Sequence, residues 1–176
     1  FKNDLLDILL GLFDKNRDTH RVAWCIFWAS LPAGIIGLFT ADWIESSLRS
    51  PTFVGVNLLI WSLVFYFADR ITKNREKSQS EISELGFPKI FFIGCAQAIA
   101  LLPGTSRSGI TIAAGLLSNL NHVAATRFSF LLGAPIIFVA GMHKLITLIS
   151  GPATITNYTN LHLMIGLTIS FLVGLL

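Results

Sequence analysis

The chain has 176 residues, of which 53% are hydrophobic and only 13% are charged, and its mean hydropathy is +0.67. Soluble domains carry about a quarter charged residues, so this composition indicates a membrane protein and excludes an ordinary soluble domain. The formal net charge is +3, and basic residues cluster beside apolar segments. Anionic lipid headgroups are the expected neighbours of such clusters, and we expect no nucleic-acid partner.

The chain does not begin with Met, and residues 172–176 stop inside an apolar run. We therefore expect a fragment of a longer protein, with residues 1–176 forming a single membrane domain. Cys25 and Cys95 both fall in apolar runs without metal-ligand spacing. We interpret them as small buried side chains rather than as a redox or metal pair.

Apolar periodicity predicts an all-α, polytopic integral membrane protein, because several apolar runs approach the roughly 20 residues that a membrane-spanning helix needs. A polar link at 42–51 separates the first two spans. The predicted segments are an amphipathic helix at 3–14, transmembrane helices at 22–40, 53–68, 122–148 and 161–176 (the last one truncated), and a re-entrant or broken helix pair at 90–102 and 109–118.

The distribution of basic residues predicts the orientation of the chain. The segment from Asp69 to Lys89 carries five Lys or Arg residues, whereas the 42–51 link carries a single Arg. Loops rich in Lys and Arg stay in the cytoplasm. We therefore place the 69–89 loop in the cytoplasm and the 42–51 link on the outer face. Further along, Asn119 and Asn121 mark a turn, and Asn121 is a predicted N-cap of the next helix.

Arg107 is the only formal charge between Ile90 and Thr126. A charged side chain at the centre of a membrane helix costs about 2.5–3.5 kcal/mol on insertion scales, so a chain that keeps one usually supplies an anion or carbonyls to meet it. The apolar run before this polar stretch, 90–102, covers only about 20 Å at 1.5 Å per residue. That length favours a re-entrant pair over the alternative, one long kinked span from 90 to 117.

The stretch Pro103-Gly104-Thr105-Ser106-Arg107-Ser108-Gly109-Ile110-Thr111 contains the groups that bind a phosphate or diphosphate. Arg107 offers a bidentate guanidinium, hydroxyl donors come from Ser106, Ser108 and Thr111, and backbone N–H groups after Gly109 begin a helix. In the alternative interpretation, Arg107 extends to the membrane interface while the Ser and Gly residues pack between helices.

The segments FFIGCAQAIALLPGTSRSGITIAAGLL (91–117) and AATRFSFLLGAPI (124–136) closely resemble the undecaprenyl-diphosphatase family of bacterial membranes, also known as bacitracin-resistance proteins. The resemblance implies a multi-pass enzyme of the bacterial inner membrane whose active site opens to the outer face. The implied reaction is hydrolysis of undecaprenyl diphosphate to undecaprenyl phosphate and inorganic phosphate, which recycles the lipid carrier of peptidoglycan synthesis and confers bacitracin resistance. The implied partner is a polyprenyl diphosphate lipid in the membrane. The resemblance leaves open whether the protein forms a homo-oligomer.

When the family's functional positions are carried over to the matching residues of this sequence, the resemblance implies catalytic or phosphate-binding roles for Ser106, Arg107 and Thr111. It implies substrate-binding roles for Gly104, Ser108 and Gly109. No side chain that could act as a general base adjoins Ser106 in the sequence, because the guanidinium of Arg107 stays protonated, so we expect this hydroxyl to donate a hydrogen bond rather than to attack. The alternative function is a lipid-phosphate transporter or flippase that binds a phosphate headgroup in the same bend.

The family also has a first motif, a Glu-x-x-x-Glu run followed by Ser and His. This motif has no counterpart among residues 1–176. The resemblance implies a divalent cation, Mg²⁺ or Ca²⁺, whose ligands we expect upstream of Phe1.

Overall fold

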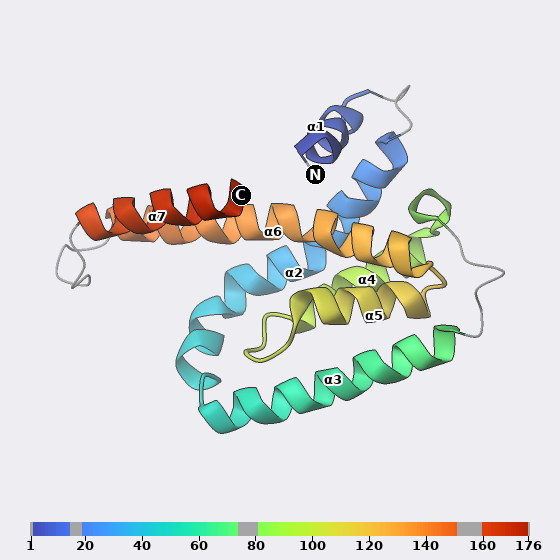
Figure 1. Cartoon of the computed structure of the whole chain (residues 1–176), viewed down its shortest axis with the longest axis horizontal. Helices are drawn as coiled ribbons and strands as arrows, with labels where there is room; N and C mark the ends of the chain where they lie inside the picture. Colours follow the sequence, from blue (N-terminus) through green and yellow to red (C-terminus); the bar gives the residue numbers. More distant parts are fainter. Residues whose placement is uncertain (1, 15–18, 74–80, 151–159, 176) are drawn as a thin grey trace. The chain divides into compact units, whose positions relative to one another are not determined.

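The computed structural model describes residues 2–14, 19–73, 81–150 and 160–175. Every regular element in these ranges is a helix, which confirms the all-α prediction (Figure 1). Three of the described helical stretches are long and apolar enough to cross a membrane, as expected of a polytopic membrane protein: His20–Ser47, Pro51–Thr72 and His122–Thr147.

The chain divides into two compact units, Phe1–Phe138 and Val139–Leu176. The second unit contains the end of helix α6 and helix α7 (Asn160–Leu175), and each of its side chains that the structure describes is exposed. The chemically distinctive residues all belong to the first unit, and the following description concerns that unit.

The first two long helices, α2 (His20–Ser47) and α3 (Pro51–Lys73), follow the short helix α1 (Lys2–Gly11). Helix α2 continues through the polar residues after position 40, so the link to α3 shrinks to residues 48–50. This stretch contains no Gly or Pro before Pro51, and an ion pair between Glu45 and Arg49 (3.2 Å), four residues apart, spans the end of α2. Pro51 opens α3, at the position where its missing N–H costs nothing.

Helix α4 (Phe87–Ile99) lies along α2, after a single 3₁₀ turn, η2 (Ile82–Glu84). The Phe87 ring meets the Trp28 ring edge-on near the start of α4, with centroids 5.8 Å apart. Beyond the end of α4, the Leu101 side chain lies beside Gly37. Contacts therefore advance in the same direction on both helices, so α4 runs parallel to α2.

Helix α5 (Arg107–Leu117) turns back from α4 and packs against both α4 and α3 (Figure 1). After α5, the His122 Nδ1 atom lies 3.7 Å from the Asp69 carboxylate, near the end of α3 that leads to the basic loop. The pair therefore returns toward the end of α3 from which the chain entered α4. The two helices therefore form a hairpin rather than one kinked span, and the re-entry of this hairpin into the membrane stays a prediction.

Asn121 caps the next helix, α6 (His122–Ser150), as predicted, because its Oδ1 accepts the Ala124 N–H at 2.6 Å. Asn119 adopts a left-handed conformation (φ 75°) in the turn between α5 and α6. Side chains from α2, α4, α5 and α6 meet in one core, whose most buried large members are Ile93, Leu116, Leu120, Phe128 and Leu132.

Candidate functional site

The bend between α4 and α5 is held by two side chains of α3. Asn57 Nδ2 donates hydrogen bonds to the Pro103 carbonyl (2.8 Å) and to the Thr105 hydroxyl (2.7 Å). Trp61 lies one turn later on α3, and its Nε1 donates to Asn57 Oδ1 at 2.9 Å. Asn57 is buried, so these bonds satisfy an amide that would otherwise be costly at this depth. The bend is thereby fixed against α3.

Gly104 allows the bend to approach α3 this closely. Its φ of +87° belongs to the left-handed region, where glycine carries no steric penalty. A Cβ atom at this position would lie 2.5 Å from the Val54 carbonyl oxygen. Both the conformation and the space at Gly104 therefore require glycine.

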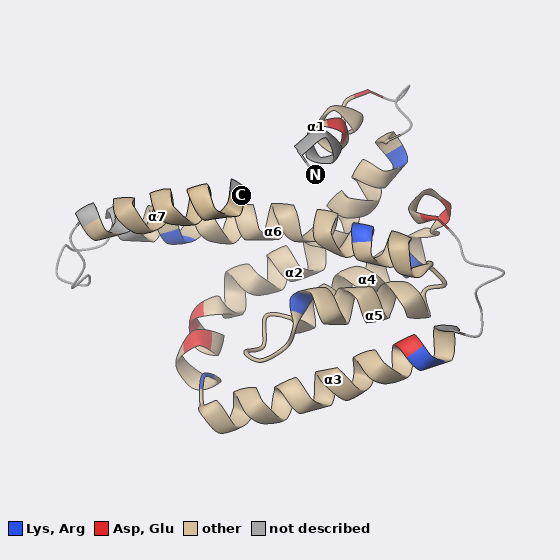
Figure 2. Cartoon of the chain, in the orientation of Figure 1, with Lys and Arg blue, Asp and Glu red and all other residues tan. Residues whose placement is uncertain are grey.

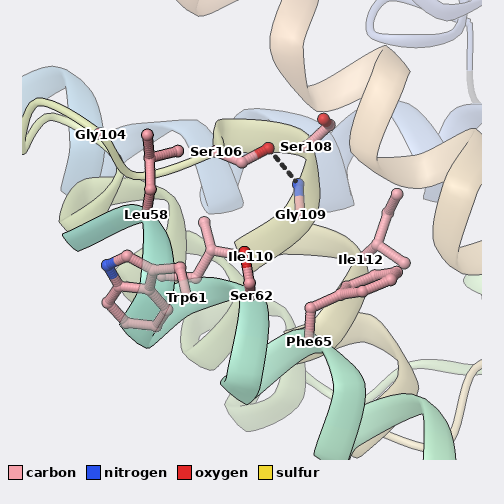
Figure 3. A pocket seen from close by; sticks show the side chains of 10 residues that line it. All are labelled: Leu58, Trp61, Ser62, Phe65, Gly104, Ser106, Ser108, Gly109, Ile110 and Ile112. Atoms are coloured by element: carbon pink, nitrogen blue, oxygen red, sulfur yellow. Dashed lines mark hydrogen bonds between the residues drawn. The ribbon is translucent and has the colours of Figure 1, made fainter. Parts of the chain in front are cut away.

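Ser106 is the N-cap residue of α5. Its backbone is extended (φ −68°, ψ 110°), and its Oγ accepts the Gly109 N–H at 3.2 Å, the dashed bond in Figure 3. The hydroxyl hydrogen of Ser106 remains able to donate to a ligand, and the Ser106 side chain is exposed. The first N–H groups of a helix lack partners within the helix and carry its positive dipole end. The start of α5 is therefore suited to an anion.

Arg107, the first residue of α5, extends toward α6. Its guanidinium lies against the backbone of Gly133, where an added Cβ atom would overlap Nη1. Arg107 Nη1 is buried and makes no hydrogen bond to any of the described residues. In Figure 2 the start of α5 is blue, the colour of Lys and Arg, and the rest of this helix is tan, the colour of uncharged residues. A buried cationic donor without an acceptor is costly unless an anion binds it.

Thr111 is 1% exposed and lies on the side of α5 that faces α6. Its Oγ1 bonds to the Arg107 carbonyl (2.8 Å) and to the Ser129 hydroxyl of α6 (2.6 Å). The structure thus joins Thr111 to the backbone of Arg107, while the hydroxyl itself is occupied by protein partners. A direct contact between Thr111 and phosphate stays a prediction.

A cavity of about 310 Å³ lies between α3 and the start of α5 (Figure 3). Four of the six predicted site residues line it: Gly104, Ser106, Ser108 and Gly109. Arg107 and Thr111 do not line it. The rest of its wall is mostly aliphatic and aromatic, with one further hydroxyl, and comes from both helices: Leu58, Trp61, Ser62, Phe65, Ile110 and Ile112.

Asn57 and Trp61 are the structural residues of this site that the motif alone does not reveal. The available signal was an uncharged amide inside the apolar run 53–68, because a buried amide in a membrane span usually has a hydrogen-bonding partner. Gln97 of α4 carries the same signal: it is 2% exposed, and both its amide atoms lack a partner within the described part of the chain.

The described residues contain no group of three or more His, Cys, Asp or Glu side chains able to hold a metal ion. The side chains around the bend are hydroxyls, an amide and a guanidinium, which are weak or unsuitable ligands for Mg²⁺ or Ca²⁺. The residues present at this bend therefore do not fit a divalent cation site by themselves.

The sequence model of the family described as "Bacitracin resistance protein BacA" matches residues 1–176. The chain belongs to this family. Among curated BacA-family relatives, it is 36% identical to Undecaprenyl-diphosphatase 1 of Pseudoalteromonas translucida (strain TAC 125), over 98% of this chain and 64% of the relative. It is 39% identical to an undecaprenyl-diphosphatase of Saccharophagus degradans, over 80% of this chain and 53% of that protein. It is 40% identical to Undecaprenyl-diphosphatase 2 of Stutzerimonas stutzeri (strain A1501), over 77% of this chain and 50% of that protein.

The chain thus spans between half and two thirds of the length of these BacA-family relatives. The family membership confirms the resemblance drawn from the bend motif and from the FSFLL segment that begins at Phe128.

Proposed function

We propose that this chain is the part of a membrane phosphatase that binds the diphosphate of undecaprenyl diphosphate. The complete protein would hydrolyse this lipid to undecaprenyl phosphate and inorganic phosphate, recycling the carrier for peptidoglycan synthesis and conferring bacitracin resistance. Membership of the BacA family and the names of the relatives support the reaction. The geometry at the start of α5 supports the assignment of the binding site.

The observation that carries the proposal is the buried, unpaired Nη1 of Arg107 at the N-terminus of α5. A guanidinium matches phosphate oxygens in a bidentate manner, and the helix N-terminus adds N–H donors and a favourable dipole. In an apolar surrounding these interactions are stronger than in water. A diphosphate at this position supplies the acceptors that the described residues do not provide to Nη1.

The roles of the individual residues follow from their positions. Arg107 binds the diphosphate and stabilises the charge on the transferred phosphoryl group, and Ser106 donates its hydroxyl hydrogen to a phosphate oxygen. Thr111 acts through its bond to the Arg107 carbonyl and keeps the first turn of α5 aligned with α6. A divalent cation, implied by the family, would neutralise phosphate charge. The bend itself offers no suitable ligands for this cation.

We propose in addition that the bend opens to the outer face of the inner membrane. The 69–89 loop is basic and is therefore cytoplasmic by the positive-inside rule. The bend contacts α3 at Val54 and Asn57, only six residues, or about 9 Å, beyond Pro51. The whole of α3 spans about 34 Å, so the bend lies near the end opposite the basic loop.

The test is phosphate release from undecaprenyl diphosphate by the complete protein in detergent. We expect Arg107→Ala to lower kcat/KM at least about 1000-fold, and Arg107→Lys to lower it about 100-fold, because an ammonium keeps the charge and loses the bidentate geometry. Unchanged phosphate release by purified, folded Arg107→Ala would overturn the proposal.

The same assay separates hydrolysis from transport. A lipid-phosphate flippase would bind undecaprenyl diphosphate with Arg107 and would release no phosphate from it. Binding without release by the wild-type protein would therefore favour the flippase.

A further inference from the structure

We propose that the cavity between α3 and α5 binds the prenyl segment that adjoins the diphosphate, so that residues of α3 contribute to substrate selection. This inference rests on the proposed function, because it takes a prenyl diphosphate as the ligand. It assigns a binding role to the three apolar or aromatic side chains of α3 that line the cavity, Leu58, Trp61 and Phe65.

The wall of the cavity changes from polar to apolar along its length. Ser106, Ser108 and the backbone of Gly104 and Gly109 form the part at the bend, where the helix N-terminus lies. Farther along, Phe65 of α3 and Ile112 of α5 face the same cavity, and the hydroxyl of Ser62 is the one polar side chain in this otherwise apolar part (Figure 3). A ligand that fits this wall is anionic at one end and hydrocarbon immediately beyond it.

The position of the anion site relative to the cavity indicates where the hydrocarbon leaves. Ser106 lines the cavity on the α3 side, and the next residue, Arg107, extends its guanidinium toward Gly133 of α6. A diphosphate at the first turn of α5 therefore lies between the guanidinium and the cavity. The group attached to the diphosphate on the side away from Arg107 enters the space between α3 and α5.

One wall residue of the cavity is held in place, and the cavity is of limited size. Trp61 is fixed by its bond to Asn57, which also holds the bend, so the ring is oriented before a ligand binds. Small-molecule sites begin at about 300 Å³. A cavity of about 310 Å³ therefore suits the first units of a polyprenyl chain and leaves the remainder of the chain in the membrane.

The experiment compares two phenylalanines of α3 in the complete protein. Phe65 lines the cavity, whereas Phe67 lies two residues later, is 57% exposed and does not line it. We expect Phe65→Ala to raise KM about tenfold for both farnesyl and undecaprenyl diphosphate, with kcat retained, because both substrates place their first units in the cavity. Tenfold corresponds to about 1.4 kcal/mol of lost contact. Phe67→Ala, the matched control, should keep wild-type values.

A second variant tests the same space in the opposite direction. Ser62 also lines the cavity and is exposed, so Ser62→Trp fills the cavity without disturbing the core and should raise KM for both substrates. The inference is overturned if Phe65→Ala and Phe67→Ala behave alike. It is also overturned if Phe65→Ala affects only undecaprenyl diphosphate, since that result indicates contact with the distal chain or with membrane lipid.

Binding of farnesyl methylene-diphosphonate, which cannot be hydrolysed, separates this inference from the proposed function. Suppose that the wild-type protein binds the analogue but releases no phosphate from prenyl diphosphates, and that Phe65→Ala weakens the binding about tenfold. This result would refute the phosphatase and retain the cavity as a prenyl site. A phosphatase whose affinity for the analogue is unchanged by Phe65→Ala would refute the cavity alone. A wild-type protein that neither binds nor hydrolyses would refute both.

Discussion

The two helices of the hairpin, α4 and α5, pack against neighbouring long helices in opposite ways. Helix α4 meets α2 through backbone-close contact: a Cβ atom on Gly94 would lie 2.5 Å from the Ala29 carbonyl oxygen, and Ala29 is completely buried. Helix α5 meets α3 across a cavity, and its polar first turn is held by hydrogen bonds from Asn57 to the preceding bend. One interface is closed and the other leaves room for a ligand.

This difference distinguishes an interface that stabilises the fold from an interface that can bind a ligand. In a membrane, helices associate through close packing of small residues rather than through the hydrophobic effect, and the Gly94–Ala29 contact is of that kind. The α3–α5 interface lacks such packing over the cavity and is held at the bend by the hydrogen bonds of Asn57 and by the close contact of Gly104 with Val54. Changes in the first interface should therefore act on stability, and changes in the second on activity.

At the closed interface we expect an effect on stability. Gly94→Ala places a methyl group against the Ala29 backbone. Neither the methyl group nor the backbone can move aside by a change of rotamer, so the two helices must separate. We expect a loss of about 1–3 kcal/mol of stability, seen as a lower Tm of the complete protein in detergent.

The matched control is Gly55→Ala in α3, where the added methyl group meets no atom within 4 Å among the described residues. It should leave Tm unchanged or raise it, since Ala is the better helix former by about 1 kcal/mol. Equal Tm values for the two variants would contradict the description of the α2–α4 interface as closely packed.

At the bend we expect an effect mainly on activity. Asn57→Leu removes both bonds to the bend and leaves the Pro103 carbonyl and Trp61 Nε1 without their partner. We expect kcat to fall about 10- to 100-fold, because a loosened bend no longer fixes Ser106 and Arg107 in position.

Trp61→Phe removes one donor and keeps the aromatic wall, so its kcat should fall only about threefold. Leu59→Ala, at a side chain that is 69% exposed and outside the cavity, is the control and should keep the wild-type rate. A wild-type kcat for Asn57→Leu, measured by phosphate release, would show that the α3 bonds do not position the site.

The sequence predicts the helices and the location of the site, because both are local properties. Apolar periodicity marks the spans, and the single charge at Arg107 in an uncharged segment marks the polar break. Asn121 as N-cap follows from the side-chain chemistry of its own turn. Even the extension of α2 beyond position 40 has a local cause, the absence of a helix breaker before Pro51.

The sequence cannot predict which side of α5 each polar residue faces, because this depends on packing between helices distant in the chain. Thr111 belongs to the motif, yet it bonds to Ser129, eighteen residues away, and lies outside the cavity. Asn57 lies outside the motif, yet it holds Pro103, forty-six residues away. The alternative of a single kinked span is likewise excluded only by the three-dimensional contact between α4 and α5.

The central claim is that Arg107 and the first turn of α5 hold the diphosphate. The most direct test is a structure of the complete protein with farnesyl methylene-diphosphonate bound. We predict phosphonate oxygens within hydrogen-bond distance of Arg107 Nη1 and of the Ser106 hydroxyl. A bound headgroup located elsewhere, with Arg107 still unpaired against Gly133, would contradict the claim.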